Sequence, residues 1–368
     1  MTFYKKILFF LLIVIPVYSF CQTNSGCSGV TISSAAVNGS YSVGSYLESD
    51  GIRDGNDYYG STIYYPENTI GLLPSIIIIP GYANPELSIQ AWGSFLASHG
   101  IVCMTIGTNS IFDEVVVRKT ALQDALISLK AEHLRFGSPL FNSLDTNLIA
   151  LGGWSMGGGG AQLVAVEDPR IKAILAFCPW IDPVDVSPLI LNHSTPILFF
   201  SGQIDVVAPP GIHADIQYNY TPNSTKKLKY EVFGDGHTIA NTPLGGFGEV
   251  GRMGLSWLKK HLVNDSCYCP LLLDVPTTAS GYETNIDCSS TNSVVDYKNE
   301  LIVYPNPSSS TITLKGLLAK NTIYKIISTS GRVLKSEVLK TSKIDVSFLK
   351  KGIYLLEYEK QKIKLIIN

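Results

Sequence analysis

A regular alternation of two kinds of segment between Ser61 and about Val263 constrains the fold most strongly. Short apolar runs rich in β-branched residues alternate with longer stretches of helical period, the pattern of βαβ units around a mostly parallel sheet. We expect strands at Ser61–Tyr65, Ser75–Ile79, Ile101–Ile106, Asn147–Gly152, Ile171–Phe177, Pro196–Ser201 and Leu228–Phe233. We expect helices at about Leu87–Ser98, Val117–His133, Met156–Val166, Pro210–Tyr218 and Phe247–Leu262. The pattern predicts an α/β fold whose strands are covered by helices on both faces.

The first residues have the layout of a secretory signal peptide. Lys5-Lys6 precede an apolar run from Ile7 to Val17, which with Pro16 inside it is short for a membrane span. We expect residues 1–21 to be removed, although an uncleaved anchor and lipidation of Cys21 remain alternatives. The chain is therefore expected to leave the cytoplasm.

Six cysteines follow residue 21, and an even number in an exported protein suits disulfides. We expect one bridge from Cys267 or Cys269 to Cys288, and Cys27 is available for a second. Cys103 and Cys178 lie in apolar, strand-like segments and are expected to be buried thiols. No matching pair of ligands stands near Cys267-x-Cys269, so no metal site is expected.

Charge divides the chain into two modules. Residues 293–368 hold 13 basic against 6 acidic residues, which leaves 15 against 24 for residues 1–292. The acidic part has no basic stripe, which argues against a nucleic acid partner. A polar stretch without periodicity, residues 289–299, is expected to link a catalytic domain at residues 22–288 to a small antiparallel β-domain at residues 300–368.

A nucleophile motif stands between a predicted strand and a predicted helix. Gly153-Trp154-Ser155-Met156-Gly157 matches G-x-S-x-G, in which a sharp turn exposes the serine hydroxyl at the carboxyl edge of the sheet. The glycines that continue to Gly160 would each cost a helix about 1 kcal/mol relative to alanine. Close packing is therefore expected around the start of this helix.

A serine hydroxyl needs a base, and the base needs a carboxylate to orient it. His237 follows the last predicted strand in a glycine-rich loop, and Asp205 follows the strand before it. We therefore predict the triad Ser155, Asp205 and His237, with Asp182 and Asp185 as competitors for the acid. Of the other histidines, His99 is expected to cap or pack against a helix, and His133, His193, His213 and His261 are expected at the surface.

Acyl transfer builds negative charge on the carbonyl oxygen, which two backbone N–H groups usually receive. The Met156 N–H follows the nucleophile directly. The loop Pro80-Gly81-Tyr82-Ala83, after an early strand, offers the Tyr82 N–H as the second donor.

The segments around these residues resemble bacterial cutinases and polyester hydrolases. The resemblance is carried by Gly152–Gly160, Pro80-Gly81-Tyr82, Trp92-Gly93, Leu96–Gly100, Thr108-Asn109-Ser110, Pro179-Trp180 and Asp205–Pro209, and it spans about Tyr41 to Cys288. Trp154-Ser155-Met156 looks like polyethylene terephthalate hydrolases, where many relatives carry histidine at position 154.

The resemblance implies an α/β-hydrolase fold and a set of substrate contacts. Tyr82 and Trp180 would flank an aromatic acyl group, and Met156 and Val207 would form apolar walls, although Trp180 has core packing as an alternative role. Trp154 and Thr238 complete the expected substrate-binding set. Thr238 stands where relatives often carry a bulky aromatic residue.

The C-terminal module resembles the sorting domain of the type IX secretion pathway. The similarity lies in the opening Tyr304-Pro305-Asn306-Pro307, in Ser330-Gly331-Arg332-Val333 and in the ending that begins at Lys351-Gly352. It implies export through an outer membrane by the type IX machinery, after which such a domain is usually removed. An ordinary β-module for adhesion or substrate binding is the alternative.

Taken together, the sequence predicts a secreted serine ester hydrolase that acts on polyesters, whether cutin-like or polyethylene terephthalate-like. No cofactor is expected, and a monomer is expected. A general lipase or short-chain esterase is the alternative within the same chemistry. A surface binding protein that keeps a hydrolase fold without activity is the alternative from another class.

Overall fold

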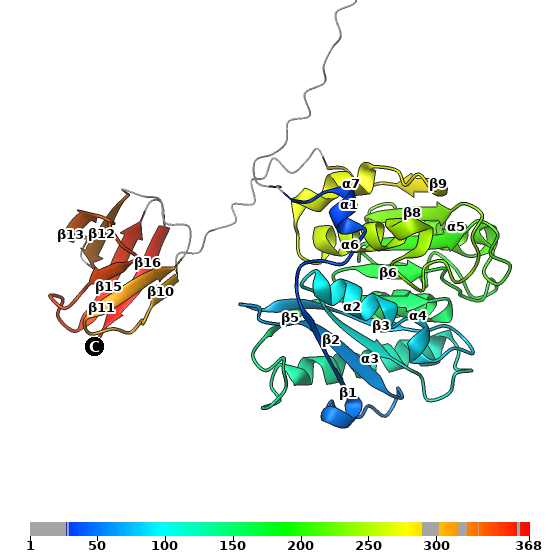
Figure 1. Ribbon diagram of the computed structural model, residues 1–368, viewed down its shortest axis with the longest axis horizontal. Coiled ribbons are helices and arrows are strands. Elements are labelled where there is room, and N and C mark those ends of the chain that lie inside the picture. The colour runs from blue at the N-terminus through cyan, green and yellow to red at the C-terminus, as the bar shows by residue number, and fades with distance from the viewer. Residues whose placement is uncertain (1–26, 28, 289–301, 316–321, 330, 359–360) are drawn as a thin grey trace, which may run out of the picture. The chain divides into compact units, whose positions relative to one another are not determined.

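The computed structural model describes residues 27, 29–288, 302–315, 322–329, 331–358 and 361–368 (Figure 1). The chain divides into two compact units, Met1–Cys288 and Ser289–Asn368. The expected signal peptide and linker lie outside the described residues. Among the helices that are described, none combines the length and the apolar character needed to cross a bilayer.

The first unit is built around one nine-stranded sheet with the order β1-β2-β4-β3-β5-β6-β7-β8-β9. Its strands are β1 (Val43–Leu47), β2 (Ser61–Pro66), β3 (Leu73–Ile79), β4 (Val102–Ile106), β5 (Leu144–Trp154), β6 (Ile174–Phe177), β7 (Ile197–Gly202), β8 (Lys227–Val232) and β9 (Ala279–Thr284). The strands from β4 to β8 pair in parallel, whereas β1, β2 and β9 pair antiparallel. All seven expected strands are present, and the expected α/β class is confirmed.

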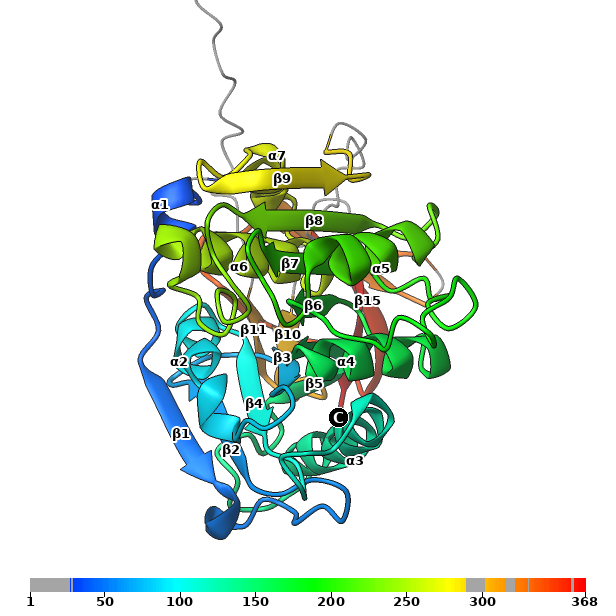
Figure 2. The same ribbon diagram turned by 90° about the vertical axis from the view of Figure 1, so that its right-hand side faces the viewer.

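Helices cover both faces of this sheet. They are α1 (Ile32–Ala35), α2 (Ala91–Ser98), α3 (Val115–Glu132), α4 (Met156–Glu167), α5 (Ala214–Tyr220), α6 (Glu249–His261) and α7 (Cys269–Leu273). Figure 2 shows α2 and α6 on one side of the sheet and α3, α4 and α5 on the other. The layers follow from the crossovers between parallel strands, which place helices on the sheet faces.

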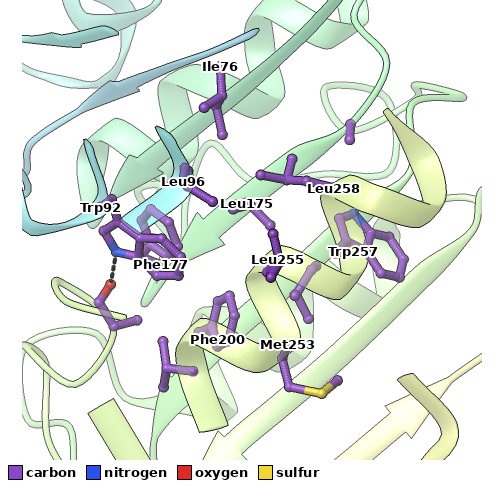
Figure 3. Packing of buried hydrophobic residues seen from close by; sticks show 14 of the residues in the cluster. Ile76, Trp92, Leu96, Leu175, Phe177, Phe200, Met253, Leu255, Trp257 and Leu258 are labelled. Atoms are coloured by element: carbon purple, nitrogen blue, oxygen red, sulfur yellow. Dashed lines mark hydrogen bonds between the residues drawn. The ribbon is translucent and has the colours of Figure 1, made fainter. Parts of the chain in front are cut away.

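Two hydrophobic cores fill the space between the helices and the two sheet faces. In β3, Ile76 and Ile78 point into the core under α2 and α6, and Ile77 and Ile79 point into the core under α3 and α4. In the first core the Trp92 ring stacks on Phe177 at 4.8 Å (Figure 3). Full burial of each such side chain stabilises the fold by about 1.5–3 kcal/mol, which explains why the strand sequences are continuously apolar.

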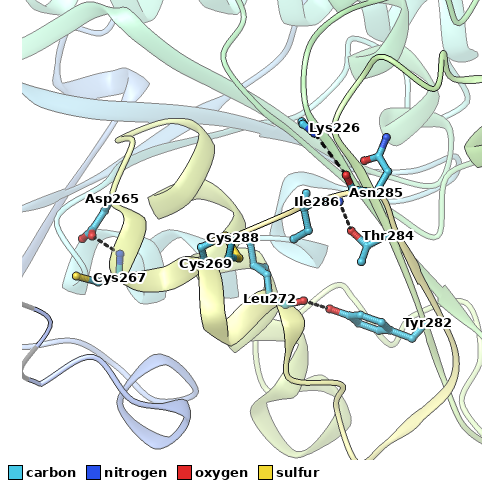
Figure 4. Close-up of a disulfide and its surroundings, with 10 residues drawn as sticks. All are labelled: Lys226, Asp265, Cys267, Cys269, Leu272, Tyr282, Thr284, Asn285, Ile286 and Cys288. Carbon is cyan, nitrogen blue, oxygen red and sulfur yellow. Dashed lines mark hydrogen bonds between the residues drawn. A yellow bond between two sulfur atoms is a disulfide. The ribbon is translucent and has the colours of Figure 1, made fainter. Parts of the chain in front are cut away.

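Two disulfides lie at the margin of the first unit. Cys27 pairs with Cys267. Cys269 pairs with Cys288, the bridge shown in Figure 4. The second bridge selects one of the two expected partners of Cys288, and the first uses the available Cys27. Cys103 and Cys178 are buried free thiols, as expected.

The expectation that most histidines lie at the surface is wrong for His193 and His213, which are buried, whereas His261 is half-buried. His193 and His213 are 4% and 3% exposed, and burial lowers the pKa of His193 to about 4. Burial likewise lowers the pKa of His261 to about 3, and its ring lies 4.2 Å from that of Trp257. Each of these side chains is covered by tertiary packing that local sequence does not report.

The second unit consists of two antiparallel sheets, as expected of a small β-domain. The sheets have the orders β10-β11-β14 and β13-β12-β15-β16. Their strands are β10 (Ile302–Tyr304), β11 (Thr311–Lys315), β12 (Ile323–Ser328), β13 (Val333–Val338), β14 (Lys343–Asp345), β15 (Gly352–Tyr358) and β16 (Gln361–Ile367). Alternate residues such as Ile326, Leu356 and Leu365 form its own hydrophobic core.

Candidate active site

Ser155 occupies a strained turn between strand and helix. β5 ends at Trp154 and α4 begins at Met156, and Ser155 between them has φ 55° and ψ −121°. A side chain in the left-handed region costs about 1–2 kcal/mol, so surrounding contacts must hold this turn. The Ser155 N–H donates to the Phe177 carbonyl at 2.8 Å, and the Ser155 carbonyl accepts the Trp180 N–H at 2.9 Å.

The glycines around Ser155 allow three backbone segments to meet. A Cβ at Gly153 would lie 2.2 Å from the Gly157 carbonyl, and a Cβ at Gly157 would lie 2.6 Å from the Ile79 and Pro80 carbonyl oxygens. A Cβ at Gly159 would lie 2.4 Å from the Trp180 carbonyl oxygen. These glycines thus permit the close packing that the sequence predicts, despite their cost to helix propensity.

The structure brings Asp205 and His237 together at the carboxyl edge of the sheet. Asp205 follows β7, His237 follows β8, and the His237 Nδ1 lies 2.7 Å from the Asp205 Oδ2. The carboxylate side chain is fully buried, and the imidazole is 12% exposed. Neither Asp182 nor Asp185 makes a hydrogen bond to His237 within the described chain.

Hydrogen bonds keep the Asp205 carboxylate ionised. Its Oδ1 accepts the N–H groups of Val207 and Ala208, each at 2.8 Å. Burial raises the pKa of Asp205, but the bonds from His237, Ala208 and Val207 outweigh burial and bring the pKa below its usual value. The charged carboxylate favours a proton on Nδ1 of His237, which leaves Nε2 as an acceptor.

Trp154 connects His237 to the strand that carries Ser155. Its indole Nε1 donates to the His237 carbonyl at 2.8 Å, and the two rings lie 5.3 Å apart. Across the described residues, no hydrogen bond joins the Ser155 hydroxyl to the imidazole. Catalytic hydrogen bonds are often long before substrate binds, so the missing bond does not exclude Ser155 and His237 as partners.

The Pro80-Gly81-Tyr82 loop passes directly beside the serine. A Cβ at Gly81 would lie 2.7 Å from the Ser155 Cβ. No acceptor for the Tyr82 N–H occurs in the part of the chain that the structure describes, and Met156 begins a helix, where N–H groups lack partners within the helix. The two N–H groups predicted for the oxyanion thus belong to residues adjacent to Ser155 and Gly81, and the Tyr82 N–H has no acceptor among the described residues.

The expected substrate-binding residues differ in exposure. Tyr82 is 45% exposed and Val207 57% exposed, Thr238 is exposed, and Met156 is half-buried. Trp180 is half-buried, with its ring 5.7 Å from that of His213.

One of the expected residues faces inward, and the structure adds another. Trp154 is only 4% exposed and packs against His237. Phe112 was not expected at the site, yet it is 58% exposed with its ring 5.5 Å from that of Tyr82. Phe112 lies just beyond Thr108-Asn109-Ser110, one of the segments that carry the resemblance to polyester hydrolases. That proximity was the one sequence signal that could have placed it at the site.

The described chain contains one group of residues whose possible ligand atoms are close enough together to hold a metal ion. It consists of Cys178, Asp205 and His237, whose ligand atoms lie within 4.8 Å of one another. Asp205 and His237 are already hydrogen-bonded to each other. Burial raises the pKa of the Cys178 thiol, which therefore stays protonated and is a poor ligand. The donor set fits a hydrogen-bonded network rather than an ion.

The first unit has a mostly parallel sheet with helices on both faces, and its strand β5 leads into α4 through a strained serine. These features define an α/β-hydrolase. The chain belongs to the family described as PET hydrolase-like, whose model matches residues 22–291. A second model, described as a secretion system C-terminal sorting domain, matches residues 302–368.

Curated relatives agree with this family. Cutinase 1 of Thermobifida cellulosilytica is 34% identical over 221 residues, which cover 59% of this chain and 79% of that protein. Lipase 1 of a Moraxella species is 32% identical over 250 residues, or 67% of this chain and 73% of that protein. The chain is accordingly an ester hydrolase, and its sorting domain marks it for export by the type IX pathway.

Proposed function

We propose that this protein is a secreted serine hydrolase of polyesters, with its activity in residues 22–288. Ser155 attacks the ester carbonyl while His237 takes its proton, and Asp205 stabilises the imidazolium that forms. The Tyr82 and Met156 N–H groups hold the oxyanion. The alcohol leaves with the proton from His237, and water then releases the acid from Ser155 by the same steps.

The observation that carries this proposal is the Asp205–His237 pair, in which the His237 Nδ1 lies 2.7 Å from the buried Asp205 carboxylate. Trp154, which directly precedes Ser155, donates from its indole to the His237 backbone carbonyl. A carboxylate that fixes Nδ1 leaves Nε2 free to act as a base, as ester hydrolysis requires. The exposed rings of Tyr82 and Phe112, 5.5 Å apart, offer an apolar surface for an aromatic acyl group.

Labelling and product analysis test the chemistry. We expect an organophosphonate to attach to Ser155 with loss of activity on a short nitrophenyl ester, and Ser155→Ala to show neither labelling nor turnover. A wild-type protein that is neither labelled nor active would contradict the mechanism and favour the binding-protein alternative.

The substrate class needs a separate comparison. We expect soluble acids to be released from a polyester film at a rate that exceeds hydrolysis of an emulsified triglyceride by equal protein. The name of the Moraxella relative, Lipase 1, makes the lipase alternative a specific one. Rapid triglyceride hydrolysis with an untouched film would establish that alternative and exclude the polyester.

A further inference from the structure

Arg118, in the first turn of α3, is a fully buried cation with no role in the proposed chemistry. It is 0% exposed, and its guanidinium donates to three backbone carbonyls. Nε donates to Asp113 at 2.9 Å, Nη1 to Pro80 at 2.9 Å and Nη2 to Ile111 at 3.0 Å. These hydrogen bonds join the start of α3 to two loops that are more than 25 residues apart in sequence.

Both loops contribute to the candidate site. Pro80 directly precedes Gly81 and Tyr82, which pass beside Ser155, and Ile111 precedes Phe112, whose ring meets that of Tyr82. A further hydrogen bond runs from the Ala83 N–H to the Ile111 carbonyl at 2.7 Å. The Ile111 carbonyl thus accepts from both Arg118 and the Tyr82 loop, so the two loops are fixed as one unit.

The Pro80 carbonyl lies close to both α3 and α4. Arg118 donates to it from α3, and α4 is so close that a Cβ at Gly157 would lie 2.6 Å from the same oxygen. Gly157 is the second residue of α4 and follows Met156. The peptide that leads to the Tyr82 N–H therefore contacts both Arg118 and the helix that begins at Met156.

Burying a guanidinium has a substantial energetic cost. Burial lowers the pKa of Arg118 to about 10, so the group remains charged at neutral pH. Its hydrogen-bond partners are carbonyls, which recover less of the desolvation cost than a carboxylate would. Replacing a buried charged group by an apolar side chain of similar volume is often neutral or stabilising, so a role beyond stability is sought in what the guanidinium holds in place.

We propose that Arg118 is a positioning residue that fixes the oxyanion-binding loop, so that the Tyr82 N–H meets the transition state formed at Ser155. It acts through the Pro80 and Ile111 carbonyls and touches no substrate. The inference rests on the proposed function, because the oxyanion exists only if Ser155 attacks an ester. A displacement of the loop by about 1 Å would cost about a hundredfold in rate.

The chain offers a matched control in Arg252. It is also 0% exposed, and it donates to the carbonyls of Leu271 at 2.8 Å and Asp274 at 3.0 Å and pairs with Glu249. It lies in α6, on the other side of the sheet from α3 and α4. Loss of Arg252 should therefore destabilise the fold without moving the Tyr82 loop.

Three full-length variants, Arg118→Lys, Arg118→Met and Arg252→Lys, are compared by Tm, by kcat and KM on a soluble nitrophenyl ester, and by inhibition with a boronic acid. Well below each Tm, we expect kcat to fall about tenfold in Arg118→Lys and about a hundredfold in Arg118→Met. Inhibition by the boronic acid, which forms a tetrahedral adduct on serine, should weaken by the same factors, with KM changed less than threefold.

Arg252→Lys should lower Tm while kcat and boronic acid inhibition stay within twofold of wild type. Equal kcat losses in Arg118→Lys and Arg252→Lys, or an Arg118→Lys protein with unchanged kcat, would overturn the inference. In each case, organophosphonate labelling of wild-type Ser155 tells whether the proposed function stands.

A measurement on the wild-type protein tests the inference even if the variants do not fold. In an NMR spectrum of the arginine Nε–H groups, we expect the Arg118 signal to shift when the organophosphonate occupies Ser155, and the Arg252 signal to stay in place. An Arg118 signal that does not respond to labelling would show that the guanidinium is not coupled to the oxyanion loop, and the inference would fail.

Discussion

Both oxygens of the Asp205 carboxylate have hydrogen-bond partners. One oxygen accepts two backbone N–H groups and the other meets His237, and neither oxygen is exposed. The backbone donors fix the carboxylate in space, and the imidazole then takes its orientation from that fixed group. The orientation and the tautomer of the His237 ring thus depend on Asp205.

Asp205→Asn tests this dependence at small cost to packing. The amide oxygen can still accept from Val207 and Ala208, but the NH2 group then faces Nδ1 and favours the opposite tautomer of His237. We expect kcat on a nitrophenyl ester to fall by about 10⁴ with KM nearly unchanged. Turnover within tenfold of wild type, in a protein of unchanged Tm, would show that Asp205 does not orient the base.

At the scale of single residues, the sequence predicted those that belong to a motif or a chain order. Ser155 stands in G-x-S-x-G, and Asp205 and His237 follow strands in the order expected for this fold. Arg118 carries no such signal, because a buried arginine in a helix looks the same in sequence as an exposed one. Its role is visible only when Pro80 and Ile111 are brought to it by the fold.

Helix α4 shows how an element is shaped by its neighbours rather than by its propensity. At Gly159, alanine would favour the helix by about 1 kcal/mol, but its Cβ would meet the Trp180 carbonyl oxygen at 2.4 Å. We expect Gly159→Ala to lower the free energy of unfolding by about 1–3 kcal/mol and to reduce kcat/KM, since the Trp180 segment must move. Urea unfolding and ester hydrolysis measure the two effects.

Two other glycines calibrate that experiment. A Cβ at Gly160 would lie 3.0 Å from the backbone nitrogen of Lys119, so Gly160→Ala should reduce stability and activity less than Gly159→Ala. A Cβ at Gly211 meets nothing within 4 Å, so Gly211→Ala should leave both stability and activity unchanged. A Gly159→Ala protein as stable as the Gly211→Ala protein would contradict the packing argument.

The strands missed by the sequence lie at the two edges of the sheet, and the short helices α1 and α7 were also not expected. β1 and β9 were not expected, because Val43–Leu47 and Ala279–Thr284 mix small, polar and aromatic residues without a clear apolar run. Their residues are mostly half-exposed or exposed, so their pairing partners rather than their composition make them strands. The central strands were predictable because burial on both faces leaves an unbroken apolar sequence.

For the molecule as a whole, buried histidines predict how stability depends on pH. In the folded state the pKa of His193 is about 4 and that of His261 about 3, both lowered by burial, against about 6.5 in an unfolded chain. Between these values the unfolded chain binds more protons, so stability falls as pH falls from 6.5 to 4. His193 alone accounts for up to about 3 kcal/mol.

The pH range of this loss of stability separates the buried histidines from the carboxylates. Asp205 has a lowered pKa, so its contribution is fully present above the ordinary pKa of an aspartate, about 4, and is lost as pH falls from there through its folded pKa. The His193 Nδ1 lies 3.0 Å from the Thr195 carbonyl oxygen, a bond that the amide of His193→Asn can replace. We expect urea midpoints to fall less between pH 7 and pH 4.5 in His193→Asn than in wild type. Parallel curves for the two proteins would exclude this histidine as the cause.

The position of the last disulfide determines where the chain can be divided. Cys288 ends the first compact unit and is bonded to Cys269, so a protein that stops after residue 291 keeps both disulfides and the whole sheet. We expect this shortened protein to retain kcat/KM within twofold, because every residue placed at the site lies before position 239. We also expect it to remain inside the cell, because residues 302–368 carry the sorting domain. Introducing Cys269→Ser and Cys288→Ser into this shortened chain should lower its free energy of unfolding by about 3 kcal/mol, the entropy of a loop of about 20 residues. If the shortened protein with both bridges loses activity while staying folded, residues of the second unit take part in catalysis, and the assignment of the chemistry to the first unit is wrong.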